Sequence, residues 1–162
     1  MLKQKEELKM AIEKVREYLK DFNLDEKIIE FEVSSATVEL AAAALNCEPC
    51  QIAKSMAFLM GEGAILVVAA GDVKIDNAKF KAQFGTKAKM VPFAEVEQYV
   101  GHAAGGVCPF ALKEGVLVYL DESLKRFESV YPAAGSSNSA IPLSIEQLEK
   151  ASAYETWVDV CK

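Results

Sequence analysis

Residues 52–70 read IAKSMAFLMGEGAILVVAA and predict the centre of the fold. Met56–Met60 and Ala64–Ala70 are two apolar runs separated by Gly61-Glu62-Gly63, which is the pattern of a β-hairpin. The second run contains no polar residue, so we expect it to be buried on both faces of a sheet. The stretch therefore predicts a central hairpin against which the other elements pack.

One cation, Lys54, stands beside this hairpin among apolar neighbours. Pro49 suits the first turn of a short helix leading toward the hairpin, so we expect Lys54 at the junction between that helix and the first strand. Burial of an unpaired charge is unfavourable, although a lysine can extend its amine to the surface. Lys54 is therefore predicted either to reach solvent or to meet an anionic group.

The rest of the chain alternates short helices with short strands. Apolar residues recur at spacings of three and four between Leu8 and Phe22, which predicts an amphipathic helix over about Lys3–Lys20. Capping and helix-opening residues predict further helices or helical turns that begin at Thr37, Asp76, Pro92, Asp121 and Ser144. Further strands are expected at 27–33, 87–91, 115–120, 127–132, 140–143 and 157–160.

This order of elements predicts an α/β (α+β mixed) fold with a mixed, barrel-like β-sheet surrounded by short helices. No linker, repeat or low-complexity segment divides the 162 residues, so we expect a single domain over 1–162 with 1–24 as an N-terminal packing helix. No Gly-x-Gly-x-x-Gly follows the first strand, which disfavours a doubly wound nucleotide-binding fold.

Charge and cysteine content limit the functional classes. The net charge of −6 excludes a broad basic surface for nucleic-acid backbone, so any contact with nucleic acid must be local. The charged N-terminus is unlike a signal or transit peptide, and no run approaches the roughly 18 apolar residues of a membrane span. Four cysteines without a secretory signal fit reduced thiols, so we expect a cytoplasmic protein.

The cysteines and the single histidine allow several interpretations. Cys47-x-x-Cys50 is compatible with a redox dithiol or half of a zinc site. Cys108, Cys161 and His102 provide no second close pair, and a complete helix separates the motif from the first strand, so structural cysteines are favoured. His102 is predicted to be an exposed loop residue, with a Cys108/His102 nucleophile pair as the less favoured alternative.

A glycine-rich loop, Gly105-Gly106-Val107-Cys108-Pro109-Phe110, is a second candidate site. Paired glycines let the backbone approach a ligand and direct N–H groups inward, where they can stabilise a developing oxyanion. Taken alone, this loop and the later turn Gly135-Ser136-Ser137-Asn138 are more often structural turns.

Four pieces taken together resemble a known family. Gln51-Ile52-Ala53-Lys54-Ser55-Met56-x-Phe58, Gly71-Asp72, the loop Gly105–Phe110 and Ala134-Gly135 are similar, in order and spacing, to the YbaK/ProX family of aminoacyl-tRNA deacylases. That family is related to the editing insertion of bacterial prolyl-tRNA synthetases, and the resemblance covers roughly residues 37–148.

The resemblance implies a trans-editing hydrolase that cleaves the aminoacyl ester of mischarged tRNA, with tRNA-Pro carrying Ala or Cys as the expected substrate. It implies no cofactor and no metal. The implied partners are the 3′ end of aminoacyl-tRNA and prolyl-tRNA synthetase, and we expect neither a membrane nor DNA as a partner.

The family pattern also implies roles for individual residues. Lys54 would hold the phosphate or ribose of the tRNA end, and the catalytic set would be completed by Gly105, Gly106 and Val107. The implied substrate-binding residues are Cys108, Pro109, Phe110, Gly135, Ser136 and Ser137. Many relatives carry a basic residue just after the later glycine, whereas this chain has Ser136, so this contact with the tRNA end is expected to be weaker or shared with other residues.

Two other functions stay open from the sequence. One is a catalytically silent binding module of the same fold that recognises an amino acid, a nucleotide or a partner protein. The other is a thiol redox protein built on Cys47 and Cys50. Release of amino acid from mischarged tRNA would distinguish the hydrolase from both.

Overall fold

The computed structural model describes the backbone from Leu2 to Lys162 and the side chains from Ala11 onward. At its centre, β2 (Ile52–Met60) and β3 (Gly63–Ala70) form the predicted antiparallel hairpin, in which Lys54 lies opposite Ala69. β3 is buried along its length after Gly63, as its apolar sequence predicts. The strand β2 begins earlier than expected, so Lys54 is its third residue and not a residue of the junction with the preceding helix.

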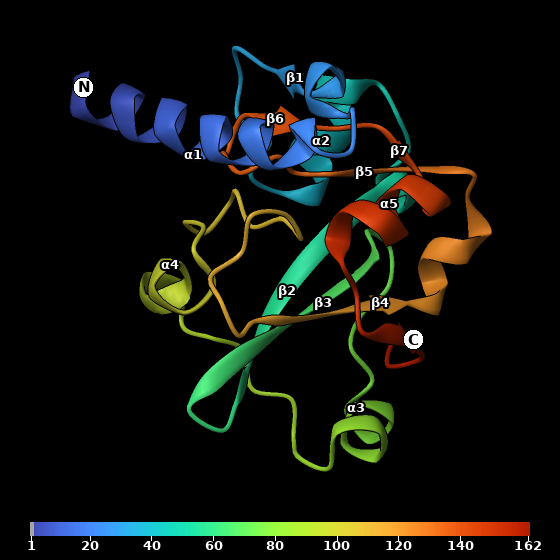
Figure 1. Ribbon diagram of the computed structural model, residues 1–162. Helices are drawn as coiled ribbons and strands as arrows, with labels where there is room; N and C mark the ends of the chain where they lie inside the picture. The colour runs from blue at the N-terminus through green and yellow to red at the C-terminus, as the bar shows by residue number, and fades with distance from the viewer. Residues whose placement is uncertain (1) are drawn as a thin grey trace.

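The hairpin lies in the middle of a six-stranded mixed sheet of order β7-β5-β2-β3-β4-β8. β5 runs parallel to β2, and β4 runs parallel to β3. The sheet curls, which confirms the predicted mixed, barrel-like architecture (Figure 1). The outer strands are β4 (Leu117–Asp121), β5 (Ser129–Pro132), β7 (Leu143–Ser144) and β8 (Thr156–Val158).

Several predicted strands are shorter than their sequence patterns indicated. β1 (Ile29–Glu30) is short because the preceding residues form a 3-10 helix, η1 (Asp25–Lys27), and it pairs with β6 (Ser139–Ala140). The predicted strand 140–143 is divided between β6 and β7 at Pro142, which has no N–H to donate to a ladder. The segment 87–91 contributes a single bridge, from Met90 to Phe58.

Three of the α-helices begin at predicted capping residues. Thr37 accepts a hydrogen bond from the backbone of α2, Asp76 does so for α3, and Ser144 forms a capping box with Gln147 in α5. The α-helices are α1 (Leu2–Lys20), α2 (Val38–Leu45), α3 (Asn77–Phe84), α4 (Val96–Val100) and α5 (Ile145–Ser152). The other 3-10 helices are η2 (Pro49–Gln51), η3 (Phe93–Glu95) and η4 (Glu122–Arg126).

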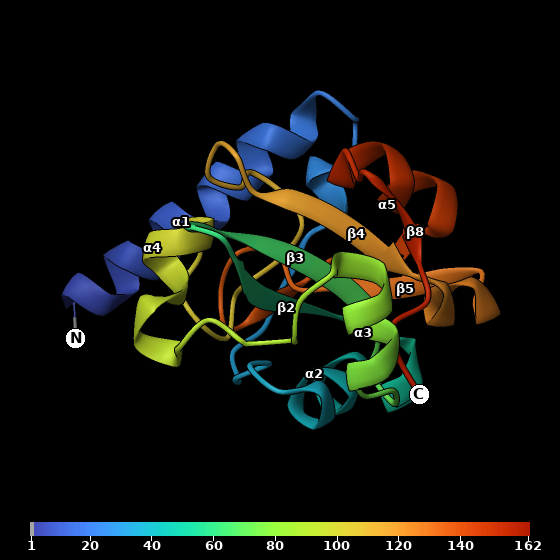
Figure 2. The ribbon, with the colours of Figure 1, turned by 90° about the horizontal axis from the view of Figure 1, so that it is seen from below.

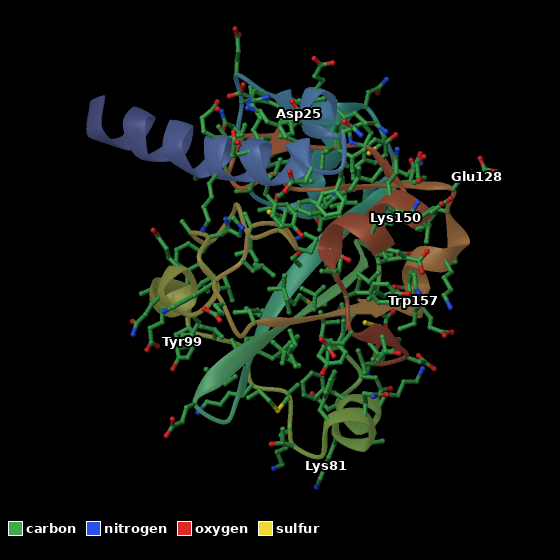
Figure 3. All side chains as sticks on the ribbon, viewed as in Figure 1. Asp25, Lys81, Tyr99, Glu128, Lys150 and Trp157 are labelled. Carbon is green, nitrogen blue, oxygen red and sulfur yellow. The ribbon has the colours of Figure 1, made fainter. Side chains whose placement is uncertain are left out.

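Two apolar layers bury the two faces of the sheet. Alternate residues of β3 contribute to a main core with α1, α4 and α5 and to a smaller core with α3 (Figures 1 and 2). Charged side chains such as Lys81 and Glu128 project outward from the periphery (Figure 3). Among the described residues, no helix is both long enough and apolar enough to cross a membrane.

Candidate functional site

A cavity of about 440 Å³ opens beside β2, where the pairing of that strand is interrupted. β2 pairs with β5 only as far as Ala53, and the segment after α3 joins β2 again only where the Val91 N–H donates to the Ala57 carbonyl at 3.0 Å. Between these points the described strand ladders pair residues 54–56 with β3 alone. The unpaired edge of β2 therefore faces an open space, and Lys54 and Ser55 line it.

The walls of the cavity are mostly small and apolar. Seven of the 21 lining residues are alanines and four are valines, so small side chains predominate. Those near the sheet and the glycine-rich loop include Ala53, Ala57, Ala104, Ala133, Val91 and Val107. The polar lining residues are Ser35, Thr37, Lys54, Ser55, Tyr131 and Ser139. A mainly apolar recess with few polar groups is typical of a small-molecule site.

Lys54 is a half-buried cation without a carboxylate partner. Its ammonium donates a hydrogen bond to the backbone carbonyl of Val73, and none of the ion pairs among the described residues includes it. Burial lowers the pKa of Lys54 below its ordinary value, and the nearby Cys161 and Asp72 partly oppose that shift. Lys54 is therefore a cavity-lining residue whose ammonium is not paired with a carboxylate among the described residues.

The nearest acidic residue of this turn is engaged elsewhere. The two carboxylate oxygens of Asp72 accept hydrogen bonds of 2.6 and 3.1 Å from the guanidinium of Arg126. This pairing holds the pKa of Asp72 below its usual range. Gly71 lets the turn approach η2, because a Cβ there would lie 2.1 Å from the Pro49 carbonyl oxygen. The close approach explains the glycine of the Gly71-Asp72 pair.

Ser55 is a functional candidate that the sequence reasoning missed. Its Oγ is buried, has no hydrogen-bond partner among the described residues and belongs to a residue that lines the cavity. Buried hydroxyls in native proteins are nearly always paired, so an exception calls for an explanation. Lys54 and Ser55 point to opposite faces of β2, and both residues line the cavity, which lies at the edge of the strand. In the sequence, the feature that could have indicated Ser55 is a hydroxyl residue directly after Lys54 in an otherwise apolar strand.

The glycine-rich loop is brought to the cavity in part. Gly105 and Val107 line it, and Gly105 adopts φ +92°, a conformation that favours glycine. Gly106 instead lies against the later turn, since a Cβ there would be 2.8 Å from the carbonyl oxygen of Gly135 and the backbone of Ser136. The glycine-rich loop therefore packs against the Gly135 turn, with Gly105 at the cavity wall and the turn behind the loop.

The later turn is held from its other side by α1. Gly135 has φ +98°, and a Cβ there would lie 2.6 Å from Val15 Cγ2 and 3.0 Å from the Ala11 carbonyl oxygen. Neither Gly135 nor its two serines, Ser136 and Ser137, belongs to the residues that line the cavity. The structure thus places them as supports of the wall, and their predicted contact with substrate stays a prediction.

The end of the glycine-rich loop is buried in the core. Cys108 and Phe110 have no exposed surface, Pro109 is buried, and none of the three lines the cavity. The geometry offers no direct support for their predicted contact with substrate. A solvent-facing position would have required the loop to turn outward, whereas Phe110 packs in the main core beside Tyr18.

His102 is buried, so the predicted exposed position was wrong. It is 1% exposed, and its Nε2 lies 2.6 Å from the Phe110 carbonyl oxygen and 3.5 Å from Cys108 Sγ. We call His102, Cys108 and Phe110 the histidine cluster. Burial raises the pKa of Cys108 to about 12 and lowers the pKa of His102. Both groups are thus held neutral, which is the opposite of an activated thiolate and imidazolium pair.

The Cys47-x-x-Cys50 motif does not have the features of a reactive thiol pair among the described residues. Cys47 and Cys50 are half-buried free thiols, and burial raises the pKa of Cys47, whereas a reactive thiol needs a lowered one. Among the side chains that the structure describes, no three His, Cys, Asp or Glu residues gather as metal ligands do.

Comparison with known proteins identifies the family. A sequence model of the aminoacyl-tRNA editing domain matches residues 32–151. The chain belongs to this family. The editing domain is 50% identical over 155 residues to the uncharacterized protein YwhH of Bacillus subtilis (strain 168), a match that covers 94% of this chain and 98% of YwhH. The resemblance to editing deacylases seen in the sequence is thereby confirmed at the level of the family.

The chain is also similar to a proline–tRNA ligase and to a protein described in relation to prolyl-tRNA synthetase. A proline–tRNA ligase of Bacillus cytotoxicus is 30% identical over 88 residues, which cover 54% of this chain and 16% of the ligase. A crystal structure described as that of a candidate trans-editing enzyme for prolyl-tRNA synthetase superposes on this editing domain with a TM-score of 0.83. It is 26% identical, and the match covers 94% of this chain and 97% of that one.

Proposed function

We propose that this editing domain is a trans-editing hydrolase, which cleaves the ester between a wrong amino acid and the terminal adenosine of a tRNA. The observation that carries the proposal is the cavity, because it is lined by a lysine without a carboxylate partner, a serine with an unpaired hydroxyl and a glycine: Lys54, Ser55 and Gly105. The expected substrate is tRNA-Pro that carries alanine or cysteine, and prolyl-tRNA synthetase is the expected partner.

The reaction needs no cofactor in this proposal. A water oxygen bonds to the ester carbonyl carbon, the bond from that carbon to the ribose oxygen breaks, and the water proton passes to the ribose oxygen. The negative charge that develops on the carbonyl oxygen requires hydrogen-bond donors or a cation already in position. The Gly106 N–H donates to the Ala103 carbonyl at 3.0 Å, so Gly105 and Val107 are the candidate backbone donors of the loop.

Lys54 and Ser55 act on the substrate from β2. The ammonium of Lys54 exchanges the Val73 carbonyl for the phosphate or ribose of the tRNA end, which fixes the ester beside the loop. The hydroxyl of Ser55 hydrogen-bonds the aminoacyl group inside the cavity, where it has no protein partner. Held in this way, the ester lies between a cation on one side and backbone donors on the other.

The size and charge of the site fit a small aminoacyl group at one tRNA end. Alanine and glycine walls leave room for a short side chain, and one methylene alters binding by only about 1 to 3 kcal/mol, so a separate site with its own walls helps discrimination. A protein of net charge −6 that binds only the end of the acceptor strand needs few cations.

Deacylation of a panel of mischarged tRNAs tests the proposal. The purified chain is mixed with tRNA-Pro charged with alanine, cysteine or proline, and the released amino acid is counted against spontaneous hydrolysis. We expect release of alanine or cysteine and retention of proline. If no mischarged tRNA loses its amino acid, and a free amino acid or nucleotide raises the melting temperature, the protein is instead a binding module.

A further inference from the structure

Two large apolar side chains are exposed at the mouth of the cavity. Phe93 is 81% exposed and Met90 is 58% exposed, and both line the cavity. A residue that faces solvent and also lines a cavity lies at its rim. Single exposed apolar residues are ordinary on protein surfaces, whereas neighbours gathered at the opening of a cavity are typical of a binding surface.

The segment that carries Met90 is fixed to the sheet. On either side of Met90, the Leu59 N–H donates to the Lys89 carbonyl at 2.8 Å and the Val91 N–H donates to the Ala57 carbonyl at 3.0 Å. Figure 1 shows this segment beside the hairpin on its path from α3 to α4. Because Val91 turns inward and is buried, Met90 must turn outward.

Phe93 is held outward in a similar way. Pro92 opens η3, and its carbonyl accepts a hydrogen bond of 2.8 Å from the Glu95 N–H. Val91 and Val96 are buried before and after this turn, so Phe93 lies on its outer side. The ring is therefore presented to solvent by an anchored backbone.

We propose that Phe93, with Met90 beside it, is a stacking platform for the base of the 3′-terminal adenosine of the tRNA. This inference rests on the proposed function, because it assigns the nucleotide part of the same substrate. An aminoacyl group inside the cavity leaves its adenosine at the mouth, where the two side chains lie. Unpaired terminal bases are bound by stacking on aromatic rings, and the thioether of a methionine adapts to such a surface.

Two small esters test the platform without the rest of the tRNA. One is 3′-O-alanyl-adenosine, and the other is the alanyl ester of methyl riboside, which has the sugar but no base. We expect the wild-type KM to be about 5- to 100-fold lower for the adenosine ester, the range that one stacked base supplies. Phe93→Ala should bring the two KM values to within about twofold of each other, chiefly by raising the KM for the adenosine ester. Phe93→Trp should keep the difference.

Leu117→Ala is the matched control, because Leu117 is an exposed apolar residue, 42% exposed, that does not line the cavity. It should leave both KM values unchanged. The inference is overturned if the wild type shows no difference between the esters, or if Phe93→Ala preserves it. It is also overturned if Phe93→Ala alters only the oligomeric state, as measured by sedimentation.

A binding measurement separates failure of the platform from failure of the proposed function. If the wild type hydrolyses neither ester, the proposed hydrolase activity has failed. Titration of wild type and Phe93→Ala with the trinucleotide CCA, followed by calorimetry, then decides the platform. Binding by the wild type that Phe93→Ala weakens at least about fivefold supports it, and equal or absent binding refutes it.

Discussion

The cavity beside β2 and the histidine cluster both hold side chains suited to catalysis, and they differ in their access to solvent. Lys54 and Ser55 belong to the residues that line an open space of about 440 Å³, and the buried Oγ of Ser55 has no hydrogen-bond partner among the described residues. In the cluster, His102 and Cys108 lie 3.5 Å apart, and the buried Nδ1 of His102 likewise has no described partner, but neither residue lines the cavity. The comparison teaches that a reactive residue type with an unpaired polar atom marks a candidate site only where space for a substrate adjoins the residue.

The largest expected effect comes from removal of the cation at the cavity. Lys54→Ala should lower kcat/KM for deacylation by at least about 100-fold, the size of effect that follows loss of one stabilising group in a reaction centre. The free energy of unfolding should stay unchanged or rise, because a partly desolvated charge is removed. Deacylation kinetics and urea unfolding measure the two quantities.

The matched control is Lys74→Ala, since Lys74 is an exposed lysine near the same turn whose backbone, not its side chain, pairs with Lys162. It should leave kcat/KM unchanged. Undiminished deacylation in Lys54→Ala across a panel of mischarged tRNAs would contradict the proposed role of the cavity.

A smaller loss is expected at the unpaired hydroxyl. Ser55→Ala should lower kcat/KM by about tenfold, the equivalent of one hydrogen bond to substrate, while the protein stays as stable or becomes more stable. The informative result is a loss of activity without a loss of stability. If the melting temperature falls in step with activity, Ser55 has a structural role, and the cavity has one proposed functional residue fewer than the contrast with the cluster assumes.

A moderate effect is expected in how the affinity for a substrate analogue depends on pH. An analogue in which an amide replaces the ester, 3′-alanylamino-3′-deoxyadenosine 5′-phosphate, should bind through the charged form of Lys54. Because burial lowers the pKa of Lys54, that charge is lost as pH rises toward the ordinary value of 10.5, and affinity should fall over the same range. Calorimetric titration from pH 7 to 10 measures the decline.

Lys54→Arg provides the comparison, since a guanidinium stays charged throughout this range. Its affinity should vary little with pH even where it is weaker at pH 7. An identical decline in both proteins would assign the pH dependence to another group.

The smallest effect on activity is expected in the histidine cluster. Cys108→Ala should leave kcat within about twofold at a temperature well below the unfolding transition, while the lost burial lowers stability by about 1 to 2 kcal/mol. In the wild type, the thiol of Cys108 should resist thiol reagents at pH 8, because its pKa is about 12. A loss of kcat beyond tenfold would place the cluster in the reaction after all.

Local signals in the sequence were sufficient for the helix ends and for the hairpin. Thr37, Asp76 and Ser144 cap helices through hydrogen bonds that span three residues, so their roles can be read from neighbouring positions. The burial of His102 could not be read this way, because it depends on how its loop packs into the main core. Ser55 was missed for a similar reason, since the break in the edge of β2 depends on where two distant segments stop pairing with it.

The contact between α1 and Gly135 has a consequence for where this module begins. The stretch shared with the family is 32–151, yet Val15 of α1 lies directly on the backbone of the Gly135 turn, where any larger residue would push it away. We therefore expect the segment 32–151 to be less stable without α1. A recombinant fragment limited to these residues would leave the Gly135 turn without its contact with Val15, so excision or grafting of the module should retain residues 2–20.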